Sequence, residues 1–429
     1  MNISTDQAMS ELKQLKEEME KCVRCGTCRS VCPTFRVIGR EAASARGKLS
    51  LIRSYLKGEL EPGEDYLRHI KECTLCGACR TSCPNGVNTT GIICAARADY
   101  VEKKGMPAAA SVVFKTLRES SSPLVLRLAT KMQGLFFKDA PIDSGLLSRF
   151  SLPLIGNGRL MPPLAKTFFL DFPEVKSLSV QKGSSGGRPR IAFYAGCGVN
   201  YLMPNIGTAS LDVLKRADAE VIVPTGQVCC GMPAYSMGDV EMARSMALKN
   251  LEAFEAGEFD FITTSCATCG YGLKTLFRKL LSGTPELAKR VEAFASKVRD
   301  ITELLANDLD FIRKGKKKEN GPTSVTYHDP CHLGRNQGVR EAPRELISAA
   351  NGVRLKEMKH PCSCCGLGGG LGISNYGLSI EITRRKAESI RDTGAQAVVT
   401  ACPGCMVQLR DGLFRYGVGT KVAHVVELL

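Results

Sequence analysis

Apolar positions three and four residues apart predict helices in several parts of the chain. The first helix is predicted from Thr5 to Met19, with Ala8, Leu12 and Leu15 on the same face as Met19. Further helices are predicted over Ala45–Leu60, Asp239–Ala256 and Leu378–Thr393. Residues 106–180 carry no motif, and the glycine- and serine-rich stretch 181–189 is typical of a linker.

Short strand-like runs that end at cysteine occur twice in the second half of the chain. The first series is IAFYAGC, VIVPTGQVCC and FITTSC, and the second is SVTYHDPC, the CSCC segment and AVVTAC. Corresponding cysteines are separated by 134, 135 and 136 residues: Cys197 and Cys331, Cys230 and Cys365, Cys266 and Cys402. These offsets indicate an internal duplication. Alternating strands and helices predict parallel sheets, with the cysteines at their carboxyl edges.

The pattern as a whole predicts a multidomain α+β and α/β chain. We expect a mostly helical domain over 1–105, a helical or irregular connection with a linker over 106–188, and duplicated α/β domains over 189–320 and 321–429. Three uncharged runs surround the cysteines of the duplicated domains: Ile191–Leu211, Val221–Gly238 and Pro361–Ile380. Glycine, proline or asparagine interrupts each run, so none is predicted to be a transmembrane helix.

Composition restricts the class of protein further. The 429 residues include 20 cysteines, and the N-terminal segment lacks the pattern of a secretory signal. We therefore expect reduced cysteines in the cytoplasm, serving as metal ligands.

The net charge of +15 would suit a zinc-bearing nucleic-acid binder, but aromatic residues are only 6% and no basic stripe accompanies the cysteines. The basic run Arg313–Lys318 is predicted to be a solvated loop.

Two dense cysteine runs have the spacing of bacterial ferredoxins. In each run, two, two and three other residues separate the successive cysteines, and a proline follows the last one. Three thiolates of a run bind one [4Fe–4S] cluster and the fourth binds the other cluster. Zinc fits this tight spacing poorly. The expected ligand sets are Cys22, Cys25, Cys28 and Cys83 for one cluster, and Cys73, Cys76, Cys79 and Cys32 for the other. Gly26 and Gly77 are expected to let the backbone turn tightly.

The duplicated half contains two further sets of five cysteines. The first is Cys197, Cys229, Cys230, Cys266 and Cys269, and the second is Cys331, Cys364, Cys365, Cys402 and Cys405. Five thiolates exceed the four that zinc takes, so a larger iron–sulfur assembly is indicated. A low density of charged residues around cluster sulfurs tunes the reduction potential of the cluster. This would explain why the three runs contain no charged residues.

Some candidate residues keep more than one interpretation. Cys94 is expected in a core, while Cys362 is either a bystander or an alternative ligand. His328 and His332 flank Cys331, and each is a structural residue, a ligand, a hydrogen-bond donor or a proton shuttle. The GLGGGLG stretch at 366–372 lacks the spacing of a dinucleotide-binding loop.

The segments CVRCGTCRSVCPTF, ARGKLSLI and CTLCGACRTSCPNGV resemble the ferredoxin-type domain of glycolate oxidase iron–sulfur subunits. The paired halves resemble the cysteine-rich CCG domains of heterodisulfide reductase, found in its B and D subunits. The same order of domains is found in the C subunit of anaerobic glycerol-3-phosphate dehydrogenase.

The resemblance implies an electron-transfer subunit of a flavin-dependent 2-hydroxy-acid dehydrogenase. An FAD-containing partner would oxidise glycolate or D-lactate, and electrons would leave toward a quinone, a cytochrome or another carrier. It implies two cubane [4Fe–4S] clusters and one or two further, noncubane ones on the sets of five, with no nucleic-acid partner. The chain would be cytoplasmic or peripheral on the inner membrane face. Because both sets of five are complete, an enzyme that reduces a disulfide, like the D subunit of heterodisulfide reductase, stays as the alternative.

Overall fold

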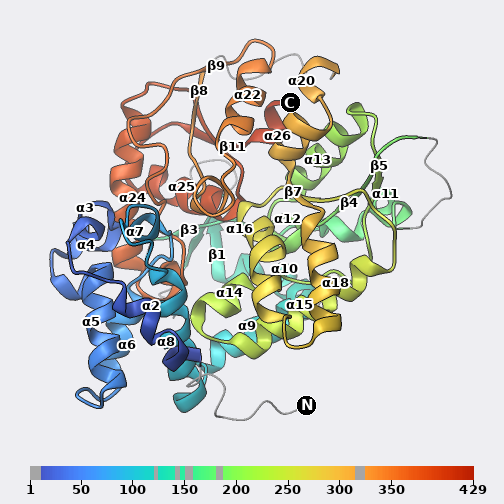
Figure 1. Ribbon diagram of the computed structural model, residues 1–429. Coiled ribbons are helices and arrows are strands. Elements are labelled where there is room, and N and C mark those ends of the chain that lie inside the picture. Colours follow the sequence, from blue (N-terminus) through green and yellow to red (C-terminus); the bar gives the residue numbers. More distant parts are fainter. Residues whose placement is uncertain (1–10, 120–123, 141–144, 150–157, 180–186, 315–323) are drawn as a thin grey trace. The chain divides into compact units, whose positions relative to one another are not determined.

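The computed structural model describes residues 11–119, 124–140, 145–149, 158–179, 187–314 and 324–429. The chain forms two compact units, which are interleaved in sequence (Figure 1). Unit 1 comprises Met1–Phe114, Pro233–Ala243 and Cys364–Arg384. Unit 2 comprises Lys115–Met232, Arg244–Ser363 and Arg385–Leu429. Unit 1 therefore joins the ferredoxin-like region to two short segments of the duplicated half.

The regular elements of unit 1 are all helices in the described part of the chain. The helices are α2 (Lys16–Glu20), α3 (Thr27–Val31), α4 (Pro33–Ile38), η1 (Glu41–Ala43), α5 (Ala45–Leu56), α6 (Glu64–Lys71), α7 (Ala78–Thr81), α8 (Thr89–Lys104) and α23 (Leu371–Ser374). Four further helices cross the division between the units: α9 (Ala108–Leu117), α14 (Met232–Met237), α15 (Val240–Glu255) and α24 (Tyr376–Arg391). Within unit 1, Leu371, Leu378 and Ile382 pack against Ile38 at the end of α4.

Unit 2 contains two parallel four-stranded sheets, as the alternating pattern predicts. The first has the order β5-β4-β6-β7, formed by β5 (Glu220–Ile222), β4 (Arg190–Phe193), β6 (Phe261–Thr264) and β7 (Val298–Asp300). The second has the order β9-β8-β10-β11, formed by β9 (Arg354–Leu355), β8 (Ser324–Tyr327), β10 (Ala397–Thr400) and β11 (Lys421–His424). All residues of β8 and β10 are buried, as is usual for parallel strands covered on both faces.

The remaining elements of unit 2 surround these sheets. A small antiparallel sheet consists of β1 (Phe137–Asp139), β2 (Leu146–Ser148) and β3 (Leu160–Met161). The helices are α10 (Leu124–Phe136), η2 (Phe169–Asp171), α11 (Pro173–Ser177), α12 (Gly196–Tyr201), α13 (Pro204–Arg216), α16 (Ala267–Tyr271), η3 (Gly272–Leu276), α17 (Phe277–Leu280), α18 (Pro285–Ser296), α19 (Ile301–Glu303), η4 (Leu304–Asp308), α20 (Phe311–Lys314), α21 (Cys331–Gly334), α22 (Glu341–Ala349), α25 (Pro403–Arg415) and α26 (Val425–Leu428).

The strand order confirms the internal duplication. Strands β4, β5, β6 and β7 correspond in turn to β8, β9, β10 and β11. The last strand of each series ends at a residue whose side chain caps the following helix: Asp300 accepts from Thr302 N and His424 accepts from Val426 N. The two halves therefore repeat both the strand order of the sheet and the capped connection from its last strand to the next helix.

The predicted helices are present, with small differences at their ends. Helix α5 ends at Leu56, four residues earlier than predicted. Residues 5–10 of the first predicted helix lie outside the described residues, and Leu12 and Met19 are buried as expected. The CSCC segment is not a strand: β9 ends at Leu355, nine residues before Cys364. Strand β9 is only two residues long and lies at the edge of its sheet, which explains why the sequence pattern did not locate it.

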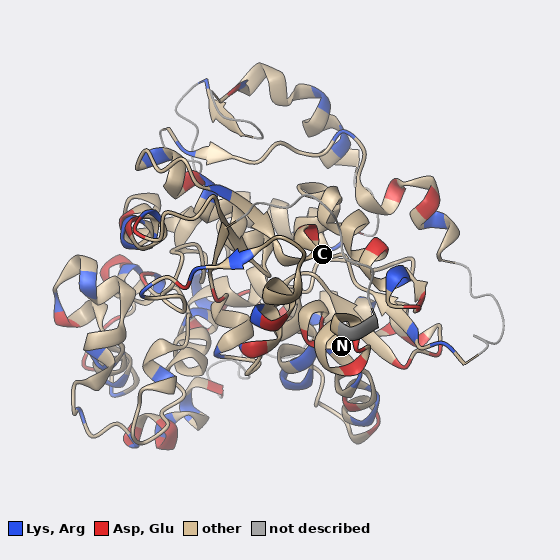
Figure 2. Ribbon diagram, turned by 90° about the horizontal axis from the view of Figure 1, so that it is seen from above, with Lys and Arg blue, Asp and Glu red and all other residues tan. Residues whose placement is uncertain are grey.

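Charged residues of both signs are mixed along the helices (Figure 2). This distribution agrees with the absence of a basic stripe in the sequence. Of the predicted basic loop, Arg313 and Lys314 form the end of α20, and residues 315–318 lie outside the described residues. No helix in the described part of the chain is long and apolar enough to cross a membrane.

Arg97, in the middle of α8, joins the three segments of unit 1. Its side chain is buried, with the residue 1% exposed. It donates to backbone carbonyls at distances of 2.8–3.2 Å, those of Ile70, Lys71, Cys73 and Gly369, and also to that of Ser236. Five donors in a rigid fork can satisfy this many acceptors, which a lysine could not do.

We expect Arg97→Met to destabilise unit 1 by about 3 kcal/mol or more, because several buried carbonyls would lose their donor. The measurement is an anaerobic thermal melt of the purified protein, followed by far-UV circular dichroism. Arg68→Met is the matched control, since Arg68 forms an exposed ion pair with Asp65 that contributes at most about 1 kcal/mol. Equal melting temperatures for both variants would contradict this role of Arg97.

Candidate iron–sulfur sites

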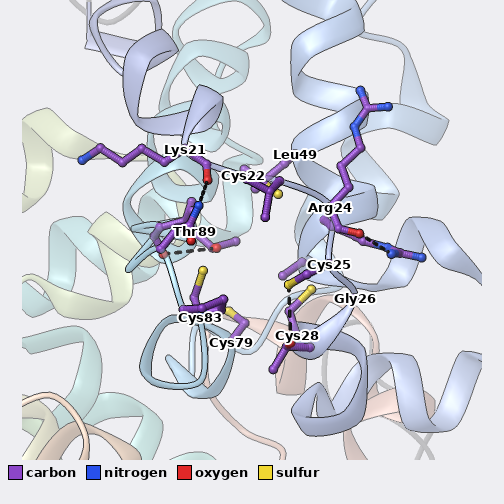
Figure 3. A pocket seen from close by; sticks show the side chains of 17 residues that line it. Lys21, Cys22, Arg24, Cys25, Gly26, Cys28, Leu49, Cys79, Cys83 and Thr89 are labelled. Atoms are coloured by element: carbon purple, nitrogen blue, oxygen red, sulfur yellow. Dashed lines mark hydrogen bonds between the residues drawn. The ribbon is translucent and has the colours of Figure 1, made fainter.

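The first sulfur-lined cavity of unit 1 contains one complete predicted ligand set. Cys22, Cys25, Cys28 and Cys83 all line it, together with Cys79 (Figure 3). The empty space is about 410 Å³, including open solvent. Gly26 precedes α3 with φ +89°, a left-handed conformation, which confirms the predicted tight turn.

The second cavity contains the other predicted set. Cys32, Cys73, Cys76 and Cys79 line it, around about 360 Å³ of empty space. Gly77 precedes α7 with φ +73°, matching Gly26. Cys32 and Cys83 each lie in the cavity of the opposite run, which is the crossed arrangement that the spacing predicts. Each cavity thus gathers the four sulfurs of its set.

Burial and hydrogen bonds shift the pKa values of the cysteine thiols in these cavities. Burial raises the pKa of Cys28, Cys73 and Cys79 above the ordinary thiol value, whereas the hydrogen bond with Thr27 lowers the pKa of Cys25. Neighbouring thiolates raise it further at Cys79. These buried groups therefore become thiolates only where a bound cation compensates their charge. The four-sulfur donor sets fit an iron–sulfur cluster in each cavity.

Two basic residues of α5 line these cavities, and the sequence patterns did not single them out as functional. Arg46 lines the first cavity, donates to Arg24 O at 2.8 Å and pairs with Glu41 at 2.6 Å. Lys48 lines the second cavity, and its Nζ donates to the carbonyl of Ala43 at 2.7 Å. The signal that could have revealed Lys48 is its place on the buried face of α5, beside Leu49.

The first set of five cysteines lies wholly within unit 2. Cys197 follows β4, Cys266 and Cys269 follow β6, and Cys229 and Cys230 lie between β5 and α14. All are buried except Cys197, which is partly buried, and the sulfurs of Cys197 and Cys229 are 3.9 Å apart. Thiol hydrogen bonds from neighbouring cysteines lower the pKa of Cys230 to about 5. The predicted gathering of cysteines beyond the carboxyl ends of the strands is present here.

Glycines make this close approach of the sulfurs possible. Gly196 has φ +66°, and a Cβ there would lie 2.8 Å from the sulfur of Cys269. A Cβ on Gly272 would lie 3.3 Å from the Cβ of Cys230. Real Cβ atoms do not approach a sulfur as closely as 2.8 Å, so only glycine fits position 196 without displacing Cys269.

The second set is divided between the units in the described chain. Cys331, Cys402 and Cys405 belong to unit 2, whereas Cys364 and Cys365 open the third segment of unit 1. Within unit 1, the carbonyl of Cys365 accepts from Thr383 Oγ1 at 2.7 Å, and Gly366 N donates to the Cys364 sulfur at 3.4 Å. All five members are buried except Cys331, which is partly buried.

Cysteines of the two repeats meet inside unit 2. Ala267 N donates to Ala401 O at 3.1 Å, next to Cys266 and Cys402. Hydrogen bonds from neighbouring thiols, Cys266 first, lower the pKa of Cys402 well below the ordinary value. Thr268 Oγ1 lies 3.6 Å from the Cys402 sulfur and 3.0 Å from His332 Nδ1. These contacts give His332 a defined hydrogen-bond partner.

The other ambiguous residues occupy contrasting environments. Cys94 is buried in α8, as expected for a core residue, and Cys362 is exposed. His328 is fully buried, and neither ring nitrogen has a hydrogen-bond partner in the described part of the chain. One of them lies within 4.8 Å of the Cys405 sulfur. Burial lowers the pKa of His328 to about 3, so the ring is neutral and able to accept a bond from a bound group.

Family models match three parts of the chain. A 4Fe-4S dicluster domain matches residues 18–87, and a cysteine-rich domain named CCG matches twice, over residues 191–274 and 325–410. These matches cover the two ferredoxin-like runs and both sets of five cysteines, and they indicate iron–sulfur clusters.

Several curated proteins are similar over most of the chain. A probable glycolate oxidase iron-sulfur subunit of Bacillus subtilis is 31% identical over 445 aligned residues, covering 100% of this chain and 98% of that protein. The B subunit of fumarate reductase (CoM/CoB) of Methanothermobacter marburgensis is 32% identical, covering 96% of this chain and 72% of that protein. Lactate utilization protein A 2 of Bacillus mycoides is 32% identical over 241 residues, covering 56% of this chain and 98% of that protein.

Among solved structures, a hypothetical protein from Helicobacter pylori has a similar fold. The TM-score is 0.51 at 10% sequence identity, and the match covers 99% of this chain and 76% of that chain. At this identity the likeness concerns the fold alone.

If the first set of five cysteines binds a cluster, we expect Gly196→Ala to lower the iron bound per chain, because the new Cβ would displace the Cys269 sulfur. Iron and acid-labile sulfide are measured after anaerobic purification. Gly226→Ala is the matched control: it has φ +83° and the same left-handed cost of about 1–2 kcal/mol, but its Cβ would meet only Ala253 at 3.7 Å. Full iron content in Gly196→Ala would refute the expectation.

Proposed function

The chain belongs to the family of the glycolate oxidase iron–sulfur subunit, and from this membership we propose that it is the electron-transfer subunit of a flavin-dependent 2-hydroxy-acid dehydrogenase. The substrate of the complex would be glycolate, D-lactate or a similar acid. The observation that carries the proposal is the pair of four-sulfur cavities in unit 1, combined with full-length similarity to an iron–sulfur subunit named for glycolate oxidase.

In this proposal the two cavities hold one cubane [4Fe–4S] cluster each. The ligands are Cys22, Cys25, Cys28 and Cys83 in the first cavity, and Cys32, Cys73, Cys76 and Cys79 in the second. The sets of five cysteines hold one or two further clusters: Cys197, Cys229, Cys230, Cys266 and Cys269 form one set, and Cys331, Cys364, Cys365, Cys402 and Cys405 form the other. Bound clusters supply single-electron storage, while the protein fixes their spacing and electrostatic surroundings.

The chain would act together with an FAD-containing subunit that oxidises the hydroxy acid. Electrons would leave toward a quinone or cytochrome at the inner face of the membrane, with this chain on the cytoplasmic side. Nothing in the mixed charge distribution calls for a nucleic-acid partner.

Helix α10 offers a surface for the flavoprotein. Its inner face is fixed by Gln133, whose side chain exchanges two hydrogen bonds with the backbone of Leu164. Its outer face carries large apolar side chains that are 38–80% exposed: Leu124, Val125, Leu128, Met132, Leu135 and Phe136. An exposed apolar face of this kind is expected to be buried when a complex forms. We assign this face of α10 as the surface that binds the proposed flavoprotein.

The complex of this chain with its flavoprotein should show cluster reduction by hydroxy acid under anaerobic conditions. Glycolate, lactate and glycerol-3-phosphate are added in turn, and bleaching of the visible iron–sulfur absorbance is followed. One substrate is expected to bleach the clusters, whereas the isolated chain should not respond. Failure of all three substrates with the fully loaded complex would refute the proposed function.

A disulfide reductase of the heterodisulfide type is the second candidate. Two observations favour it: both sets of five cysteines are complete, and the chain is 32% identical to the B subunit of a fumarate reductase (CoM/CoB). In that case, Cys230→Ser or Cys365→Ser would abolish disulfide reduction while the two ferredoxin-type clusters stay intact. Unchanged turnover in both variants would exclude this candidate.

On the docking surface, we expect Leu128→Glu or Leu135→Glu to weaken flavoprotein binding about tenfold or more, since burying a leucine contributes about 1.5–3 kcal/mol. Affinity is measured by interferometry with the immobilised flavoprotein. Ile373→Glu is the control, because Ile373 is also an exposed large apolar residue (48%) but lies in unit 1. Equal affinities for all variants would show that α10 is not the interface.

A further inference from the structure

Two buried cations lie beside the second cavity of unit 1. Lys48 and Arg97 are each 1% exposed. Lys48 Nζ donates to the carbonyls of Ala42 and Ala43 at 3.2 and 2.7 Å, and Arg97 donates to the carbonyl of Cys73 at 2.8 Å. In the described part of the chain, no carboxylate lies within ion-pair distance of either. Both cations are therefore held by backbone dipoles, and no ion pair neutralises their charges.

The cations of the first cavity are arranged differently. Arg46 is 26% exposed and pairs with Glu41, and Lys21 is 55% exposed and pairs with Glu18. Arg24, which also lines this cavity, is exposed. Water and neighbouring carboxylates screen these charges. The two cavities thus have the same four-sulfur donor set in unlike electrostatic environments.

This difference bears on how easily each site accepts an electron. A cluster held by four thiolates is already anionic, and reduction adds one more negative charge. Burial alone makes that addition less favourable, whereas an unscreened buried cation makes it more favourable. Lys48 lies where this compensation is needed, since it lines the cavity that contains the buried Cys76, whereas Cys25 of the first cavity is exposed.

We propose that Lys48 sets the reduction potential of the second cluster site, with Arg97 behind Cys73 as a supporting charge. This inference rests on the proposed function. The electron comes from the reduced flavoprotein, which loses one electron, and no bond is made or broken. Lys48 keeps its proton throughout, so it is a positioning residue that acts through its charge.

The chemistry around Lys48 supports a lasting charge. Burial lowers its pKa, but the nearby thiolates of Cys73 and Cys32 act in the opposite direction, as does Glu72. The hydrogen bonds to the carbonyl oxygens of Ala42 and Ala43 favour the charged ammonium over the neutral amine. The carbonyl of Ala43 also accepts from Thr34 Oγ1 at 3.1 Å, so it keeps a partner when Lys48 is replaced.

The test is an anaerobic redox titration of the purified, cluster-loaded protein, followed by electron paramagnetic resonance. Lys48→Gln removes the charge and keeps a donor for the carbonyls, while Lys48→Met removes both. Lys57→Gln is the control for charge at the end of the same helix, because Lys57 is exposed. Arg46→Gln is the control for the other cavity.

The inference expects one of the two ferredoxin-type signals to be harder to reduce in both Lys48 variants. At the wild-type midpoint its ratio of reduced to oxidised cluster should fall about tenfold, equivalent to about 59 mV for one electron. The other signal should be unchanged. Lys57→Gln should move neither signal, and Arg46→Gln should move only the other signal, and by less.

Two results would overturn the inference. One is a Lys48→Gln potential equal to that of Lys57→Gln. The other is a wild-type potential in Lys48→Gln with a shift only in Lys48→Met, which would assign the effect to hydrogen bonding. If Lys48→Met does not load clusters, Lys48→Gln decides alone. Absence of both signals, iron and sulfide in the wild-type protein would overturn the proposed function as well, whereas loaded clusters without a shift would overturn this inference only.

Discussion

Packing several cysteine sulfurs close to one another is the constraint on which the rest of this structure depends. Thiolates repel each other and are costly to bury, so the surrounding chain has to bring them together at little steric cost and offset their charge. Backbone shape provides the first condition, with left-handed turns before α3 and α7 and a glycine against the Cys269 sulfur. Buried basic groups provide the second condition at the cavity lined by Lys48.

The excess of positive charge has a different meaning once these sites are known. A count of +15 treats every cysteine as neutral. Each tetracysteinyl cluster would contribute about −2, so several clusters would remove much of the excess. Basic residues such as Lys48 then belong to the electrostatic balance of the interior.

The sequence predicts those features that depend on local spacing. The crossed membership of Cys32 and Cys83 follows from the ferredoxin interval, and the duplicated strand order follows from repeated apolar runs. The edge strand β9 was not predictable in the same way, because two residues carry no recognisable period. A buried lysine within α5 also resembles an ordinary helical lysine until the fold places Ala42 and Ala43 at its ammonium. The three-segment composition of unit 1 rests on contacts across hundreds of residues, such as that between Arg97 and Gly369, and no local pattern encodes these.

The interleaving of unit 1 has a consequence for biosynthesis. The carbonyls that hold Arg97 include those of Ser236 and Gly369, and a Cβ on Gly369 would lie 2.2 Å from the Cys73 carbonyl. The ribosome must therefore add the stretch from Phe114 to Gly369 before Arg97 has all of its acceptors. At roughly 5–20 residues per second this takes on the order of tens of seconds. During that interval Arg97 lacks two of its five carbonyl partners, so unit 1 reaches its final packing only late in synthesis.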